Sequence, residues 1–330
     1  DYTAPFTQNE WSIRFTVRPT QKDNVDFRYL HQKSINVNNG GSSNGFSYDV
    51  PAASKNLGGT WVRQIASSMT NEFKATTQNL NVEFGGADSS FGISAIPKPA
   101  DIGNTVANIS FSGASLASIK SATGLSTIGG ATNIPQGRLV KVYQFADTIT
   151  WVKGKHNMVM GAEYKHLINK VPFLPLYQGS FVFNSLTRLQ NNAPSAISLT
   201  AGEPVTTYTE NDQYYYFQDD FKIRSNLTLN LGVRYEYTGQ PINQLHDITV
   251  ARESGSSKAI FDPTLPLSVR TVPYVAPDKN NFAPRVDFAY SPNFESGFLH
   301  TLFGKDATVI RGGFSIASDP AFYNILLNLQ

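Results

Sequence analysis

The amino-acid sequence predicts an all-β fold, an antiparallel up-and-down β-barrel whose strands cross a membrane. Three observations lead to this prediction: long stretches alternate between apolar and polar side chains, short turns alternate with long connections, and aromatic residues are abundant. The clearest alternation spans residues 214–237, where two arms of about ten residues flank the turn 224–226. A period of two gives a strand one apolar and one polar face. A tilted strand of about 9–11 residues is long enough to cross a bilayer.

The composition is compatible with this fold. Of the 330 residues, 16% are charged and 12% are aromatic, whereas soluble domains have roughly 25% charged residues. No apolar run approaches the roughly 18 residues of a transmembrane helix, which excludes a helical span, and barrel strands need no such run. The lack of cysteine suits an envelope protein. The net charge of +2 gives no indication of nucleic-acid binding.

A soluble β-sandwich is the competing interpretation of the alternation. Sandwich strands usually have about 5–6 residues, and the arms of the 214–237 hairpin are longer. Arg234 and Glu236 lie well inside one arm, where a soluble core would penalise them. A wide barrel with a wet lumen accommodates such charges, together with aromatic residues near the strand ends, and is therefore favoured.

The first predicted hairpin lies near the start of the chain. Residues 11–18 read WSIRFTVR, in which every second residue is apolar. The polar run 19–24 predicts a turn, and the alternation resumes over residues 25–29. A weaker pair of strands is expected at 61–65 and 71–78, where the alternation is poor.

The second half of the chain repeats one unit. Residues 138–152 and 156–166 predict a hairpin around the turn 153–155, and the 214–237 hairpin follows. FADTI before the first turn is similar to FQDDF before the second, and GAEY after the first turn is similar to GVRY after the second. This repeat indicates an up-and-down meander.

Two further strands are predicted at 282–290 and 308–316, which brings the total to about ten. Connections rich in Gly, Ser, Asn or Pro separate the hairpins, and we expect long loops at residues 36–57, 85–137, 170–209 and 239–280. Short turns at one rim and long loops at the other are typical of a membrane barrel.

The alternation places ten charged residues opposite the apolar side chains. These candidates for a lumen-facing position are Arg14, Arg18, Arg28, Glu163, Lys165, Arg234, Glu236, Arg285, Asp287 and Arg311. They could contact a plug or a solute. The simpler interpretation is a structural network, in which neighbours of opposite charge on adjacent strands satisfy each other.

Aromatic residues near the strand ends are expected at the membrane interface, where amphipathic rings gather. The candidates are Trp11, Tyr143, Trp151, Tyr164, Tyr214 and Tyr237. Stacking on a solute is the alternative role. Asp147 and Asp219 fall on the apolar face close to their turns, so each either lies at the interface or is turned inward by a bulge.

No residue is predicted to be catalytic, and no metal or cofactor site is expected. His156 and His166 are ten residues apart on one predicted strand, which is roughly 30 Å, too far for both to share a metal with Glu163. The segment 41–45 has the letters of a G-x-S-x-G nucleophile elbow, but it lacks the preceding strand and following helix that the elbow requires.

With these residues assembled, the chain resembles the TonB-dependent outer-membrane receptors, in particular the Oar-like branch with a carboxypeptidase-regulatory-like domain. The resemblance covers the barrel portion only and most of residues 60–320. The matching phrases are FADTITWVKGKHNMVMGAEYK, FNSLTRLQNN, YYYFQDDFKIRSNLTLNLGVRYEY, PDKNNFAPRVDFAYSP and ATVIRGGFSI.

The resemblance implies a Gram-negative outer membrane, a plugged barrel of about 22 strands and energised uptake of a large or scarce solute. It implies as partners the outer-membrane lipid and the plug domain and TonB system of a longer parent protein. Neither a plug nor a TonB box is found in this sequence, which opens at Asp1 without a signal peptide, so we expect a processed or partial chain. A structural or adhesive surface protein and a soluble secreted β-sandwich binding module are the alternatives.

Overall fold

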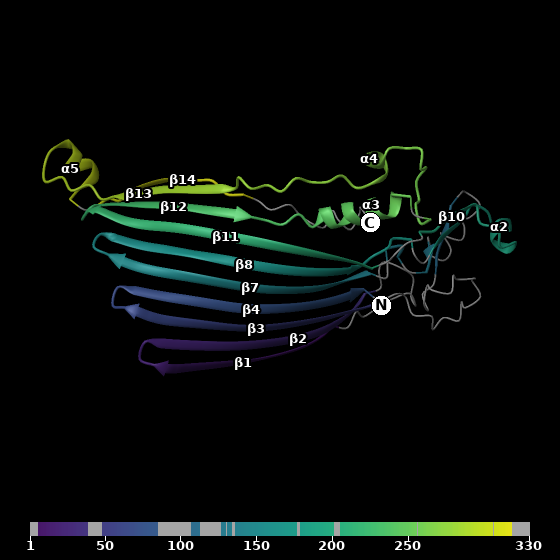
Figure 1. Ribbon diagram of the computed structural model, residues 1–330, viewed down its shortest axis with the longest axis horizontal. Helices are drawn as coiled ribbons and strands as arrows, with labels where there is room; N and C mark the ends of the chain where they lie inside the picture. The colour runs from purple at the N-terminus through teal and green to yellow at the C-terminus, as the bar shows by residue number, and fades with distance from the viewer. Residues whose placement is uncertain are drawn as a thin grey trace.

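Ten strands form one antiparallel sheet in the computed structural model (Figure 1). The structure describes residues 6–38, 48–84, 107–112, 127–129, 131–133, 136–176, 179–200, 205–255, 257–305 and 307–318. The strands of the sheet are β1 (Phe6–Thr20), β2 (Asp23–Asn38), β3 (Tyr48–Ala66), β4 (Met69–Phe84), β7 (Gln136–Lys153), β8 (His156–Pro172), β11 (Val205–Arg224), β12 (Leu227–Tyr237), β13 (Phe282–Tyr290) and β14 (Ile310–Ser315).

Each strand of this sheet pairs with its neighbours in chain order, so the predicted antiparallel up-and-down fold is confirmed. Within the described residues the sheet is open, and β1 and β14 form its two edges. Tight turns join β1 to β2, β3 to β4, β7 to β8 and β11 to β12 at one end, here called the short-turn end (Figure 1). The opposite end is called the long-loop end.

Several strands extend further than the sequence predicts. β2 continues to Asn38 and β3 begins at Tyr48, so the predicted loop 36–57 is wrong at both ends. β11 begins at Val205, inside the predicted loop 170–209. The added stretches of β2 and β3 are rich in Asn and Ala, which have weak strand preference. They join the sheet because neighbouring strands satisfy their backbone groups, which overrides propensity.

Two predicted loops share a second, smaller sheet. β5 (Asn108–Phe111) and β6 (Thr127–Ile128) lie within 85–137, and β9 (Ser180–Phe183) and β10 (Ala196–Ser198) lie within 170–209. The order of this four-stranded sheet is β10-β9-β5-β6, with β5 parallel to β9. These parts of the two loops are therefore not structureless. Much of 85–137 and all of 39–47 lie outside the described residues.

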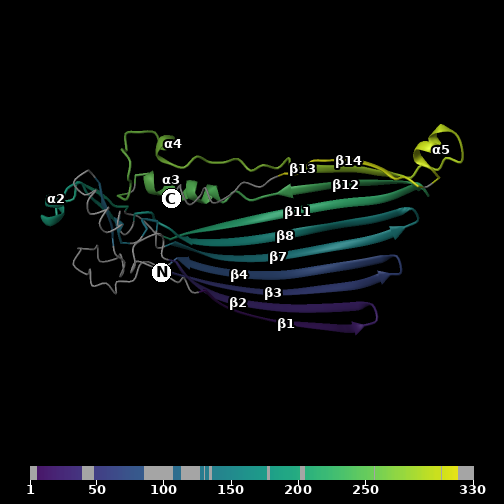
Figure 2. The same cartoon turned by 180° about the vertical axis from the view of Figure 1, so that it is seen from behind.

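The helices are short and lie at the two ends of the large sheet. Figure 2 shows α2 (Leu186–Gln190), α3 (Ile242–Glu253) and α4 (Leu267–Arg270) at the long-loop end, with α3 and α4 inside the predicted loop 239–280. α5 (Phe298–Phe303) lies at the short-turn end, between β13 and β14. No helix in the described part of the chain is long and apolar enough to cross a membrane.

The register gives the large sheet two unlike faces. On the apolar face, Phe217 of β11 pairs with Met160 on one side and Val233 on the other. On the polar face, the next residue, Tyr216, pairs with Arg234 and Gly161. Leu231 and Val233 are 39% and 43% exposed, so no second layer of the described chain covers the apolar face there, as a sandwich would require.

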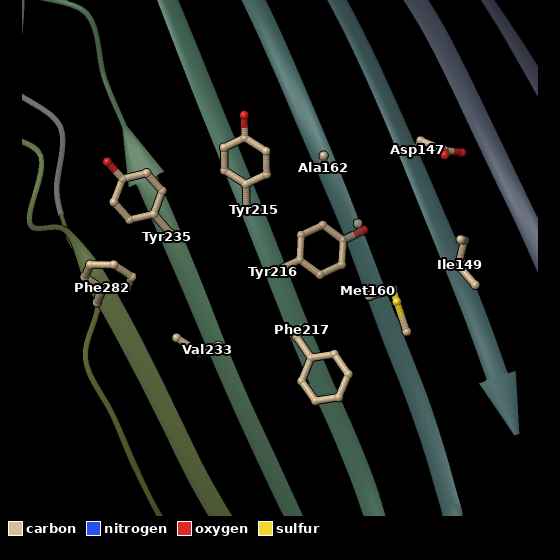
Figure 3. Close-up of a pocket in the computed structure, with 11 residues that line it drawn as sticks. Asp147, Ile149, Met160, Ala162, Tyr215, Tyr216, Phe217, Val233, Tyr235 and Phe282 are labelled. Carbon is tan, nitrogen blue, oxygen red and sulfur yellow. The ribbon is translucent and has the colours of Figure 1, made fainter. Parts of the chain in front are cut away.

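One packing contact on the polar face ties three strands together. The Tyr216 ring of β11 lies across β8 (Figure 3), and its hydroxyl oxygen is 2.6 Å from Oγ1 of Thr148 on β7. A Cβ at Gly161 of β8 would lie 2.5 Å from Oη and 2.6 Å from Cζ of Tyr216, and 2.5 Å from the Asp147 carbonyl oxygen. Only glycine leaves room for the ring at this position.

We predict that Gly161→Ala lowers the free energy of unfolding by about 1–3 kcal/mol, because the added methyl displaces the Tyr216 ring and its contact with Thr148. Gly232→Ala is the matched control, since a Cβ there meets its nearest atom at 3.5 Å, an ordinary contact. Urea unfolding in detergent micelles, followed by tryptophan fluorescence, measures both variants. Equal effects of the two substitutions would contradict the packing argument.

Candidate functional site

The polar face is the candidate functional site, and it carries ion pairs both between strands and within single strands. Arg14 Nε of β1 is 2.6 Å from Asp26 Oδ2 of β2, which also accepts a hydrogen bond from the Thr16 hydroxyl at 2.7 Å. On β13, Arg285 Nε is 2.5 Å from Asp287 Oδ2. Both arginines are well exposed. Exposed pairs of this kind contribute at most about 1 kcal/mol each.

A second group of contacts centres on Tyr214 of β11. Arg234 forms an ion pair with Glu236 on β12 and lies over the Tyr214 ring, 4.8 Å from its centroid. Glu163 of β8 accepts a hydrogen bond from Gln144 of β7 at 2.8 Å. Tyr214 pairs with Glu163 and Glu236 and so lies on the polar face. The prediction that Tyr214 belongs to the interfacial aromatics is wrong, because the alternation that puts Tyr215 on the apolar face puts Tyr214 opposite.

Lys165 and Asp212 form the most buried ion pair of the large sheet. Lys165 Nζ is 2.7 Å from Asp212 Oδ2, and the two side chains are 29% and 1% exposed. Asp212 Oδ1 accepts a hydrogen bond from the Gly239 backbone amide at 3.2 Å. This pair therefore links β8 and β11 to the segment that leaves β12. The sequence did not predict Asp212 as a site residue, because the strand that contains it was expected to begin at Tyr214, two residues later.

The register places nine of the ten predicted charged residues on the polar face. These are Arg14, Arg28, Glu163, Lys165, Arg234, Glu236, Arg285, Asp287 and Arg311. Arg18 falls inside the irregular pairing between Val17 and Thr20, so the ladder does not fix its face. Among the described residues, neither Arg28 nor Arg311 forms a salt bridge.

Helix α3 covers the polar face at the long-loop end. Leu245 of α3 packs with Val171, Phe173 and Tyr208 in a buried apolar cluster. Val171 and Tyr208 lie on the same face as Lys165 and Asp212, since each is an even number of residues along the strand. The polar face thus becomes apolar where the helix covers it.

Hydrogen bonds fix this helix to the strand end. The Gln244 side chain accepts from the Thr209 backbone amide at 3.0 Å and donates to the Thr209 carbonyl oxygen at 2.5 Å. The Asn243 side chain makes the same reciprocal pair with the backbone of Val275, at 2.8 Å in each direction. Segment 239–280 is therefore docked on the sheet rather than projecting freely from it.

The buried carboxylate of Glu253 joins the end of α3 to residues that follow it in segment 239–280. Glu253, 1% exposed, lies 2.8 Å from Arg252 Nε and 3.3 Å from Arg270 Nη1. Burial alone would raise the pKa of Glu253. The backbone amide of Ile260, the Arg252 guanidinium and the backbone amide of Phe261 donate to the carboxylate and hold its pKa below the ordinary value. Sequence alone gave no signal for this cluster.

The apolar face has a shallow groove of about 480 Å³ over Ala162 (Figure 3). Aromatic and aliphatic side chains from β7, β8, β11, β12 and β13 surround it, among them Met160, Tyr215, Phe217 and Tyr235. The lining offers few polar groups that could orient a polar solute. The groove is therefore suited to apolar chains rather than to a hydrophilic ligand.

Asp147 and Asp219 lie on the apolar face, and the pairing of their strands is regular at both positions, so no bulge turns them inward. Each has a polar partner on a neighbouring strand. Asn71 Nδ2 donates to Asp147 Oδ1 at 2.6 Å, and His156 Nδ1 is 2.7 Å from Asp219 Oδ2. His156 also stacks on Phe221, with ring centroids 4.3 Å apart.

The remaining predicted aromatics lie on the apolar face. Trp11 lies in the half of β1 toward the long-loop end, Tyr143 and Tyr164 lie near the middle of β7 and β8, and Trp151 lies beside the turn after β7. Tyr237 ends β12. No cluster of three metal-ligating side chains occurs in the described ranges.

Comparison with known proteins extends these observations. A family model described as an outer membrane beta barrel domain matches residues 2–330. No curated protein matches the chain.

Solved structures are similar to this chain. The outer membrane transporter YddB from Escherichia coli aligns with a TM-score of 0.54 and 14% identity, over 93% of this chain and 31% of that one. The ferric-catecholate import receptor Fiu of E. coli K12, in its open form, aligns with a TM-score of 0.49 and 10% identity, over 96% of this chain and 48% of that one. The chain therefore spans less than half the length of either structure.

We predict that Asp212→Asn lowers the free energy of unfolding by about 2–3 kcal/mol, because it leaves the partly buried Lys165 without its counter-charge. Asp26→Asn is the control, since its partner Arg14 is 71% exposed, and we expect a clearly smaller loss of stability there. Urea unfolding measures both changes, and hydrogen exchange of residues 239–253 reports whether Asp212→Asn also loosens α3. Equal losses of stability would show that burial does not distinguish the two pairs.

Proposed function

Because this chain belongs to the family of outer membrane β-barrel domains, we propose that it forms part of the wall of a TonB-dependent receptor, which takes up a large or scarce solute at the expense of energy. The observation that supports the proposal is the two-faced sheet of ten strands. One face carries exposed aromatic and aliphatic side chains, and the other carries ion pairs. In a membrane barrel the first contacts lipid and the second lines a wet lumen.

The charged residues of the polar face then have a defined role. The pairs Arg14–Asp26 and Lys165–Asp212 stabilise the wall, and Arg28 and Arg311 offer guanidinium groups to a plug or a solute. A barrel of about 22 strands needs more strands than the ten described here. The remainder of the wall, the plug and the TonB system are the partners that this function requires, as in the Oar-like branch that the sequence resembles.

Segment 239–280 has a particular place in this proposal. Through Leu245 and Gln244 it is docked on the polar face at the long-loop end. In the wall of a barrel it would extend into the lumen from the extracellular rim and narrow the entrance. The small sheet formed by β5, β6, β9 and β10 extends beyond the same rim, where solute is first captured (Figure 1).

The experiment compares a strain that lacks the gene with its parent and with the complemented strain. Each strain grows in a complex medium, with and without a protonophore, and mass spectrometry measures which solutes disappear from the medium. We expect one class of large or scarce solute to remain in the medium of the deletion strain. The same class should remain when the protonophore abolishes the energy supply of the parent.

Unchanged solute depletion in the deletion strain would contradict energised uptake. If the deletion strain then adheres less to surfaces, the structural or adhesive alternative is supported. If the protein is released into the medium without detergent, the soluble β-sandwich alternative gains support. The same result would contradict the proposed location in the outer membrane.

A further inference from the structure

Four lysines lie on the apolar face near the long-loop end of their strands. Lys55 of β3 and Lys141 of β7 both pair with Asn79 of β4, so they flank it in one row. Lys33 of β2 and Lys170 of β8 lie one step further out. All four side chains are exposed. Because strands are about 4.8 Å apart, the backbones at Lys55 and Lys141 are about 10 Å apart.

These lysines, called the lysine belt, lie at similar distances from the short-turn end. The separation is ten residues from Asp23 to Lys33, eleven from Lys55 to Ala66, twelve from Lys141 to Lys153 and fourteen from His156 to Lys170. A tilted strand crosses the bilayer in about 9–11 residues. The belt therefore falls at or just beyond the level where the strands leave the hydrocarbon.

In the part of the chain that the structure describes, the lysine belt has no acidic partners. No lysine of the belt forms a salt bridge with any described residue. The nearby carboxylate of Glu83 on the same face accepts a hydrogen bond from Asn81 at 3.0 Å. At the short-turn end of this face, by contrast, the acidic side chains Asp23 and Asp219 have partners, Arg63 at 3.5 Å and His156 at 2.7 Å.

Aromatic side chains border the belt on its apolar side. The Trp11 and Tyr29 ring centroids are 5.0 Å apart, and Tyr143 stacks on His166 at 6.3 Å. Aromatic rings of this kind gather where hydrocarbon meets head groups. Cations beyond such a layer can reach lipid phosphates while their methylene chains stay in the apolar region.

We propose that the lysine belt binds the phosphate groups of a phosphorylated lipid in the extracellular leaflet. Four unpaired cations on a lipid-contacting face complement an anionic head group, and a lipid with two phosphates can bridge Lys55 and Lys141. This inference rests on the membrane orientation in the proposed function, with short turns on the periplasmic side. It adds a lipid-binding surface that solute uptake does not require.

The test measures binding of bisphosphorylated lipid A by native mass spectrometry. The protein is purified from outer membranes in its native form, freed of lipid and titrated in detergent. The belt variant carries Lys33→Gln, Lys55→Gln, Lys141→Gln and Lys170→Gln. The control variant carries Lys22→Gln, Lys153→Gln, Lys155→Gln and Lys222→Gln, which remove the same charge at the short-turn end. Dephosphorylated lipid A is the control ligand.

We expect the belt variant to bind bisphosphorylated lipid A about 600-fold more weakly, since each of its four lysines near an anionic lipid surface strengthens binding about fivefold. The control variant should bind like the original protein, and dephosphorylated lipid A should bind weakly to all three. If the belt variant does not assemble, the double variants Lys33→Gln/Lys55→Gln and Lys141→Gln/Lys170→Gln carry the same test.

Undiminished binding by an assembled belt variant would overturn the proposal, as would an equal loss in the control variant. A loss confined to the control variant would place lipid phosphate at the short-turn end and also reverse the proposed orientation. Failure of the solute-uptake experiment leaves this outcome unaffected, because the lysine belt lies on the face opposite the polar side chains.

Discussion

Backbone hydrogen bonding between neighbouring strands, in a register that shifts only beside three of the short turns, is the constraint on which the rest of this structure depends. β4 and β7 pair without a shift from Met69 opposite Trp151 to Phe84 opposite Gln136. A slip of one residue would exchange the two faces of a strand over its whole length. In hydrocarbon the same hydrogen bonds are obligatory, because no water is present to satisfy a free amide or carbonyl group. The two-faced character of the sheet follows from this register.

Residues that break the alternation of apolar and polar side chains are accommodated by local contacts, and the strand register does not change at them. Asp147 and Asp219 keep their places on the apolar face and acquire Asn71 and His156 as partners. Gly161 has no side chain, so the Tyr216 ring can cross β8 and its hydroxyl can reach Thr148 on β7. At the long-loop end, α3 covers the polar face, and the residues beneath it change from ionic to apolar. Each adjustment leaves the ladder of backbone hydrogen bonds intact.

Much of the fold could be predicted from the sequence, because a period of two depends only on side-chain polarity. This period predicts the ten strands of the large sheet and the turns after β7 and β11. It also predicts the face on which residues such as Arg234 and Asp287 lie. Contacts between segments distant in sequence could not be predicted in this way. The pairing of β5 with β9 and the burial of Glu253 by Arg270 depend on tertiary packing. Tyr214 was the avoidable error, since its face follows from that of Tyr215.

The most direct test of the two-faced wall compares adjacent residues in one strand. Ala75 and Thr76 of β4 lie on the apolar and the polar face, and the chain contains no native cysteine. A nitroxide attached to Ala75→Cys or Thr76→Cys, in protein reconstituted in lipid, reports its surroundings by electron paramagnetic resonance. We expect lipid-soluble oxygen to relax the label at position 75 more strongly, and a water-soluble nickel chelate to relax the label at position 76 more strongly. Equal access of the chelate to both positions would contradict this expectation.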